Sequence, residues 1–305
     1  SPIAIDATFT KRYLDSPGEI GAELVHKVCD AFDRTSWEKN FTLIEGSGHA
    51  GVGSIFGLSN ARVAKLLGAK VIIVSRGGIG QPIDEIALNK ALFDSEGVEV
   101  VGAIINKVQS DKMEHIRTYT GRALKRLGVP LLGLLPEEKT LSSPSLKQIR
   151  ERVSARLLNR DDSFSTQRFD NIIIGAMTAT RFLEAILPNT LLITPSDRED
   201  IIIAALSHHE NVEKGSVSGI ILTRGIEPSP ELAKRIHNSC IPVIIADSDS
   251  YTVASRIHGM TVKTQPEDED KIPLIKELVQ KNIDLNQIVE SFLSLIQISA
   301  PTRPY

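Results

Sequence analysis

The sequence of 305 residues contains very little cysteine, with Cys29 and Cys240 far apart in the chain. Two distant thiols give no disulfide framework, so we expect small core side chains in a reducing compartment, the cytoplasm or an organelle stroma. No apolar run approaches the ~20 residues that a membrane span needs. The N-terminus lacks the charged-then-apolar pattern of a signal peptide, so the composition predicts a chain without membrane insertion.

An excess of basic charge is also missing. Lys and Arg number 35 against 38 Asp and Glu, which gives a net charge of −3. The basic side chains are scattered rather than aligned, so nucleic acid is not expected as a partner. With 41% hydrophobic residues, the chain is long enough for two domains with cores of their own.

Apolar runs of strand length alternate along the chain with segments of helical length. The runs span residues 41–45, 69–75, 98–108 and 129–136 in the first half, and 170–178, 189–196, 217–225 and 241–248 in the second. Runs without polar alternation are typical of parallel strands that are covered on both faces. A polar stretch at 137–168 interrupts the alternation. The sequence therefore predicts an α/β domain over 1–160, a smaller α/β domain over 161–265, and C-terminal helices with a tail over 266–305.

The first run leads into a glycine-rich stretch, FTLIEGSGHAGVGS at 41–54. Gly46, Gly48 and Gly51 have the G-x-G-x-x-G spacing of a dinucleotide-binding loop, and Gly53 follows closely. In such a loop a helix begins within the motif, yet further glycines here disfavour a helix by roughly 1 kcal/mol each. The next strand ends in Arg76 rather than in a carboxylate, so an NAD site is disfavoured and an NADP site stays open as an alternative.

A phosphate loop of the Walker A type is not present either. Gly48 and Gly53 have its glycine spacing, but Ser54 follows where the motif needs a lysine. Glu45, at the end of the apolar run, is placed as a Mg²⁺ ligand, with a helix cap or a loop salt bridge as the alternative. His49 could contact an anionic ligand or bond its own backbone. We expect this loop at the carboxyl edge of a parallel sheet, open to a cleft.

Residues 43–108 and the segment VPLLGLLPE at 129–137 resemble a P-loop domain similar to dethiobiotin synthetase and cobyrinate synthase. Such a domain is found at the N-terminus of long phosphotransacetylases. The segments NTLLITPSDREDIIIAAL, SGIILTRG and IPVIIADSDSYTVASRI are similar to the DRTGG domain that follows it. The resemblance covers about residues 1–265, so it implies a parallel-sheet P-loop NTPase-like domain followed by a DRTGG-like domain.

The resemblance also implies roles for single residues. It places Glu45 at the glutamate that helps to hold Mg²⁺ and Asn106 where adenine is recognised; a strand-end asparagine that satisfies loop amides is the alternative for Asn106. The family's P-loop lies on a strand before Ser1. Two explanations stay open: the chain is part of a longer protein, or the protein has lost its ATP-binding segment.

In the second domain, Asp197 and Arg198 match the first two letters of the DRTGG signature, whereas Glu199 and Asp200 depart from it. A structural interpretation is a capping box in which Ser196 and Glu199 satisfy the first amides of a helix. If Arg198 instead points into solvent at this helix start, it could bind an anion together with the free amides.

These observations favour a nucleotide-binding regulatory or scaffold protein that resembles the N-terminal region of phosphotransacetylase, with ATP or a related nucleotide and Mg²⁺ as ligand. The alternative is an ATP- and Mg²⁺-dependent ligase of the dethiobiotin or cobyrinate synthase type. Without a Walker A lysine or an acyltransferase domain, catalysis stays open. A homodimer is expected from an apolar stripe of Ile288, Phe292, Leu295 and Ile296; burial of the stripe within its own domain is the alternative.

Overall fold

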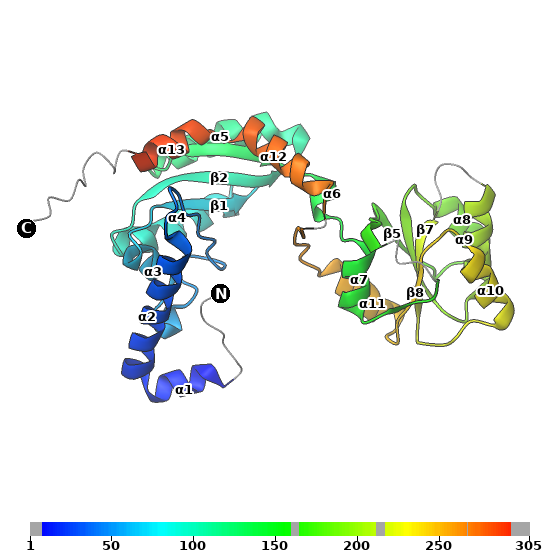
Figure 1. Cartoon of the computed structure of the whole chain (residues 1–305). Helices are drawn as coiled ribbons and strands as arrows, with labels where there is room; N and C mark the ends of the chain where they lie inside the picture. The colour runs from blue at the N-terminus through cyan, green and yellow to red at the C-terminus, as the bar shows by residue number, and fades with distance from the viewer. Residues whose placement is uncertain (1–7, 160–164, 212–216, 267, 294–305) are drawn as a thin grey trace, which may run out of the picture. The chain divides into compact units, whose positions relative to one another are not determined.

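The computed structural model describes residues 8–159, 165–211, 217–266 and 268–293. The chain divides into two compact units, each with a sheet of its own (Figure 1). The first unit consists of Ser1–Glu137 and Leu274–Tyr305, and the second consists of Glu138–Pro273. The α/β class predicted from the sequence is confirmed in both units.

The first unit is built on a parallel sheet with the strand order β1-β2-β3. Its strands are β1 (Val71–Arg76), β2 (Val100–Val108) and β3 (Leu131–Pro136). Its helices are α1 (Phe9–Asp15), α2 (Pro17–Ser36), α3 (Asn60–Leu66), α4 (Gln81–Ser95), α5 (Met113–Arg126), α13 (Leu285–Leu293) and most of α12 (Lys271–Asn282), with short 3₁₀ turns η1 (Ser54–Phe56) and η2 (Ser110–Lys112). Ile86 on α4 and Leu124 on α5 are fully buried against Ile105 of β2, so these helices supply much of the core.

The apolar run at 41–45 does not form a strand, which corrects the prediction made from its composition. Within the described residues, its backbone amides and carbonyls make no hydrogen bonds, and the side chain of Leu43 is 85% exposed. An apolar sequence favours burial, but a strand also requires a neighbouring strand to pair with. Neither β1 nor any other described strand pairs with this segment.

The second unit contains a larger sheet with the order β4-β8-β7-β6-β5, parallel except for the antiparallel β4. Its strands are β4 (Arg156–Leu157), β5 (Asn171–Ile174), β6 (Thr190–Pro195), β7 (Val217–Thr223) and β8 (Val243–Ile245). Its helices are α6 (Lys139–Ser142), α7 (Leu146–Val153), α8 (Ala179–Ala185), α9 (Glu199–Asn211), α10 (Pro230–Asn238) and α11 (Ser250–His258). Buried side chains from α8, α9 and α10 pack on one face, and those from α7 and α11 pack on the other (Figure 1).

The bounds of these units differ from the domain limits of 1–160, 161–265 and 266–305 that the sequence suggested. Helix α7 belongs to the second unit because Leu146 and Ile149 are buried against its sheet. The C-terminal helices return to the first unit, where the amide of Asp284 donates to the carbonyl of Leu132 over 2.9 Å.

Two smaller expectations also have structural outcomes. Cys29 is half-buried and Cys240 is exposed, and both are free thiols, so the expected core role is wrong for Cys240. Phe292 of the apolar stripe packs edge-on against Phe41 of its own unit, with ring centroids 5.4 Å apart. Two other stripe residues, Leu295 and Ile296, lie outside the described residues. Among the helices described here, none is long and apolar enough to cross a membrane.

Candidate functional site

The glycine-rich loop is closed on itself by two asparagines from neighbouring helices. The Nδ2 of Asn60 on α3 donates to the carbonyls of Ser47 and His49, at 2.9 and 2.8 Å. The Oδ1 of Asn89 on α4 accepts from the amide of Ala50 at 2.6 Å. These bonds fix the loop in one conformation, although it follows an unpaired segment rather than a strand.

Two of its glycines are required by the backbone. Gly53 has φ of 95° and Gly48 has φ of 68°, in the region that side chains rarely adopt. A Cβ on Gly53 would lie 2.2 Å from the carbonyl oxygen of Leu58. Gly46 and Gly51 have no positive φ and would place a Cβ at ordinary contact distances. The backbone conformation of the loop therefore explains Gly48 and Gly53, but not Gly46 and Gly51.

The loop leaves a short run of amides free. The amides of Ala50 and Gly51 are bonded to Asn89 and to the Nδ1 of His49. By contrast, the four consecutive amides of residues 46–49 donate to no group in the described part of the chain. Successive free amides can bind an anion such as a phosphate oxygen. The bond from Gly51 to His49 matches the structural alternative given for this histidine.

The remaining predicted residues of the first unit lie apart from one another. Glu45 is exposed, and among the described residues it forms no hydrogen bond or ion pair. Where the structure is described, no group of three or more His, Cys, Asp or Glu side chains could hold a metal ion. The Oδ1 of Asn106 accepts from the next amide, of Lys107, at 2.8 Å, and Lys107 has φ of 57°. Asn106 and Lys107 lie within β2, so this bond stabilises the irregularity of the strand between Ile105 and Val108 rather than a loop beyond it.

Arg198 of the DRTGG-like motif is half-buried, and its guanidinium group bonds neighbouring groups of its own unit. Its Nε and Nη2 donate to both carboxylate oxygens of Asp200 at 2.9 Å, and Nη2 also donates to the carbonyl of Met177 at 2.8 Å. The hydrogen bond from Arg198 lowers the pKa of Asp200, and the same bond raises the pKa of Arg198. Arg198 therefore ties the turn after β5 to the start of α9, while Asp197 is exposed.

The expected capping box at Ser196 and Glu199 is not formed. The Oγ of Ser196 is buried and donates to the carbonyl of Thr223 at the end of β7, over 2.9 Å. The hydroxyl of Thr223 in turn shares a hydrogen bond of 2.8 Å with the Oγ of Ser250, at the start of α11.

These hydroxyls lie at the carboxyl ends of β6 and β7, which is the edge where open α/β sheets bind ligands. Sequence reasoning singled out neither Thr223 nor Ser250. The available signal was a hydroxyl residue close to the carboxyl end of an apolar run.

Two family models match consecutive parts of this chain. The model of the AAA domain matches residues 3–145, and the model of the DRTGG domain matches residues 148–260. One solved structure that matches is that of the CBS and DRTGG domains of the regulatory region of Clostridium perfringens pyrophosphatase, complexed with the activator diadenosine tetraphosphate. It is 22% identical in sequence, and the match has a TM-score of 0.34. The match covers 47% of this chain and 61% of the chain in that structure.

Curated relatives match most of this chain. The phosphate acetyltransferase of Nitratidesulfovibrio vulgaris is 27% identical over 278 residues, which are 88% of this chain and 39% of the relative. That of Synechocystis sp. is 28% identical over 286 residues, 89% of this chain and 40% of the relative. The chain thus spans about two fifths of the length of these relatives. Its first part is thus similar to the AAA domain and its second part to the DRTGG domain, and over most of its length it resembles one part of the phosphate acetyltransferases.

Proposed function

We propose that this chain is a nucleotide-binding regulatory or scaffold protein, similar to the N-terminal regulatory region of phosphotransacetylase. The observation that carries the proposal is the succession of an AAA domain and a DRTGG domain in one chain. The similarity to phosphate acetyltransferases extends over both domains, but it involves only about two fifths of those relatives. A role in binding and regulation requires no acyl-transfer machinery in this region.

The proposed ligand is ATP or a related nucleotide with Mg²⁺. The free amides of residues 46–49 offer donors to phosphate oxygens, because consecutive amides form anion-binding concavities. Glu45 immediately precedes them and has an exposed carboxylate that is not engaged by any described residue, so it is available to a hydrated Mg²⁺. Asn106 would recognise adenine only after its side chain leaves the amide of Lys107.

The second candidate is an ATP- and Mg²⁺-dependent ligase of the dethiobiotin or cobyrinate synthase type, which the AAA match favours. Phosphoryl transfer depends on groups that neutralise the charge of the transferred phosphate, and the lysine of a Walker A loop is one of them. The sequence contains no G-x-x-x-x-G-K-[ST] motif. Turnover of ATP by the purified chain would favour the ligase, and binding without turnover would favour the regulatory role.

Calorimetric titration of the purified chain with MgATP tests the proposed site. We expect Glu45→Gln to weaken binding by about tenfold or more, since loss of a group that supports a metal typically costs 10–100-fold. Glu114→Gln is the matched control, because Glu114 is also an exposed glutamate of the first unit, on α5. If Glu45→Gln bound MgATP as tightly as the unmodified chain, the role of Glu45 would be refuted.

The assembly and the compartment belong to the same proposal. We place the chain as a homodimer in the cytoplasm or an organelle stroma, supported by its DRTGG domain and by two free thiols. Sedimentation of the unmodified chain over a micromolar concentration series tests the dimer, and a monomer throughout would remove it. Phe292→Asp is unsuited to this test because Phe292 packs against Phe41.

A further inference from the structure

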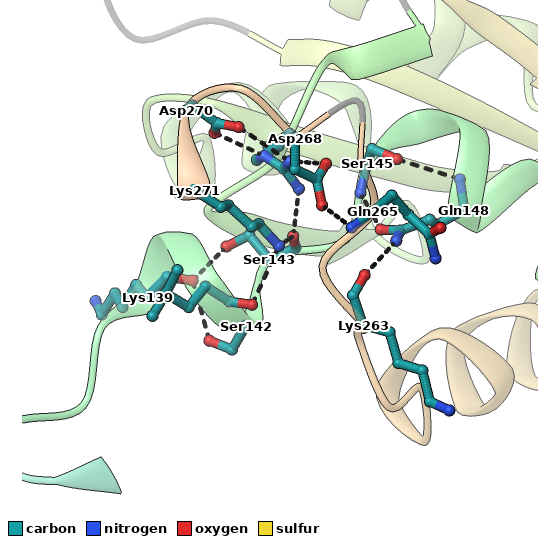
Figure 2. A network of polar contacts seen from close by, with 12 residues as sticks. Lys139, Ser142, Ser143, Ser145, Gln148, Lys263, Gln265, Asp268, Asp270 and Lys271 are labelled. Atoms are coloured by element: carbon teal, nitrogen blue, oxygen red, sulfur yellow. Dashed lines mark hydrogen bonds and ion pairs between the residues drawn. The ribbon is translucent and has the colours of Figure 1, made fainter. Parts of the chain in front are cut away.

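A fully buried lysine lies at the end of the second unit, at the first residue of α12. The side chain of Lys271 is 0% exposed, and its Nζ donates to the carbonyls of Leu141 and Ser143 at 3.1 and 3.2 Å (Figure 2). An ammonium group without water is costly unless hydrogen bonds replace its hydration. Here the two carbonyls lie at and just beyond the end of α6, where a positive charge is favourable.

The charge of Lys271 is unfavourable at its position on α12, so the helix itself does not explain why a lysine is buried there. A cation at the first residue of a helix opposes the helix dipole. Burial lowers the pKa of Lys271, and the nearby charge of Arg168 lowers it further, against the opposing effect of Asp268 and Asp270. The contacts with the distant carbonyls are therefore what stabilises the side chain in this place.

Arg168 completes the arrangement from a third segment of the chain. Its Nη1 donates to the same carbonyl of Ser143 at 2.9 Å, and its Nε donates to Asp270 at 3.1 Å. It also forms an ion pair with Asp268, whose second carboxylate oxygen accepts from the amide of Gln265 at 2.9 Å (Figure 2). We call Arg168, Asp268, Asp270 and Lys271, with the carbonyls of Leu141 and Ser143, the Lys271 cluster.

The cluster joins two stretches of chain that are far apart in sequence. Leu141 and Ser143 lie a few residues after Glu137/Glu138, where the chain enters the second unit, and Lys271 lies just before Pro273/Leu274, where the chain leaves it. Lys271 and Leu141 are 130 residues apart in sequence. All residues of the cluster belong to the second unit.

We propose that the Lys271 cluster couples the two segments by which the chain enters and leaves the second unit, residues 138–146 and residues 265, 266 and 268–273, so that they open as one cooperative element. With the cluster intact, the two segments open and close together. Without it, each segment opens by itself. This device acts whichever ligand either domain binds.

Hydrogen exchange of Lys271→Met tests this coupling, because methionine keeps the length of the side chain and removes its charge and donors. A hydrogen bond to a charged group changes an opening equilibrium by roughly tenfold or more. We expect amides in both connecting segments to exchange at least about tenfold faster in the variant, while β6 and β7 keep their protection.

Lys263→Met is the matched control, because Lys263 lies just before the second connecting segment with an exposed side chain. It should leave hydrogen exchange in both segments unchanged. If Lys271→Met fails to fold, Arg168→Lys replaces it, and both segments should again exchange faster, since lysine cannot reproduce the bonds of the guanidinium group. Faster exchange in only one segment, in neither, or across the whole second unit would overturn the proposal.

Discussion

Replacement of Gly53 by alanine tests whether the glycine loop has the closed conformation described here. Gly53 has φ of 95°, and a Cβ would lie 2.2 Å from the carbonyl oxygen of Leu58, whereas real Cβ atoms stay beyond 3.0 Å. The backbone would have to move by about 0.8 Å. We expect a left-handed conformation to cost roughly 1–2 kcal/mol and the overlap another 1–3. Reduced entropy of the unfolded chain offsets about 0.4–1 of this.

The expected net loss in the free energy of unfolding of the first unit is therefore about 2–4 kcal/mol. Gly68→Ala is the control, since Gly68 follows α3 with φ of 60° and has no atom within 4 Å of its would-be Cβ. In Gly68→Ala only the conformational cost applies, so we expect its free energy of unfolding to fall by about 1 kcal/mol or less after the entropic offset. Hydrogen exchange at increasing denaturant measures both variants unit by unit. Equal losses for Gly53→Ala and Gly68→Ala would refute the contact with Leu58 and the closed loop.

Two further predictions concern the second unit. Arg198→Met should speed hydrogen exchange after β5, because it removes the bond to the carbonyl of Met177, while β7 stays protected; unchanged exchange at 175–178 would contradict this role. Burial alone would raise the pKa of Asp268, but the amide of Gln265 and Arg168 lower it, and Arg168 likewise lowers the pKa of Asp270. Their stabilising contribution is therefore complete above the unfolded pKa of about 3.9 and is lost as the pH falls through the lower folded values. For Lys271 the lowered pKa means that the buried ammonium group costs stability at neutral pH, and stability rises with pH between its folded pKa and the unfolded value of about 10.4. Removal of Arg168 raises the folded pKa values of both carboxyl groups, so acid titration of thermal stability should show a smaller loss at low pH for Arg168→Met than for the unmodified chain. Superimposable losses would argue against the pairing.

The alternation of apolar runs was enough to predict the parallel sheets, because buried strands differ from amphipathic helices over short windows. The resemblance to a P-loop domain followed by a DRTGG domain depended on particular segments of the sequence instead. It failed at residues 41–45, since composition indicates a preference for burial but does not reveal whether a neighbouring strand is present to pair with it. The side chains of His49 and Asn106 bond backbone amides one or two residues away. Contacts between such close neighbours can be anticipated from the sequence.

Contacts between residues far apart in the chain could not be predicted from the sequence. The hydroxyl of Ser196 could satisfy either the local amide of a capping box or the carbonyl of Thr223, which is 27 residues away, and the distant partner prevails. A true capping box occurs at Ser145 and Gln148, where both reciprocal bonds are present. The Lys271 cluster depends on bonds that span 100 residues or more, so its charged residues resemble an ordinary solvated run in the sequence.

Calorimetric titration of the purified chain with ATP and Mg²⁺ tests the central claim most directly, that the region from Glu45 to His49 binds a nucleotide. The account predicts saturable binding without turnover of ATP, weakened about tenfold or more by Glu45→Gln and unchanged by Glu114→Gln. Absence of saturable heat with ATP and with ADP at millimolar concentrations would contradict it.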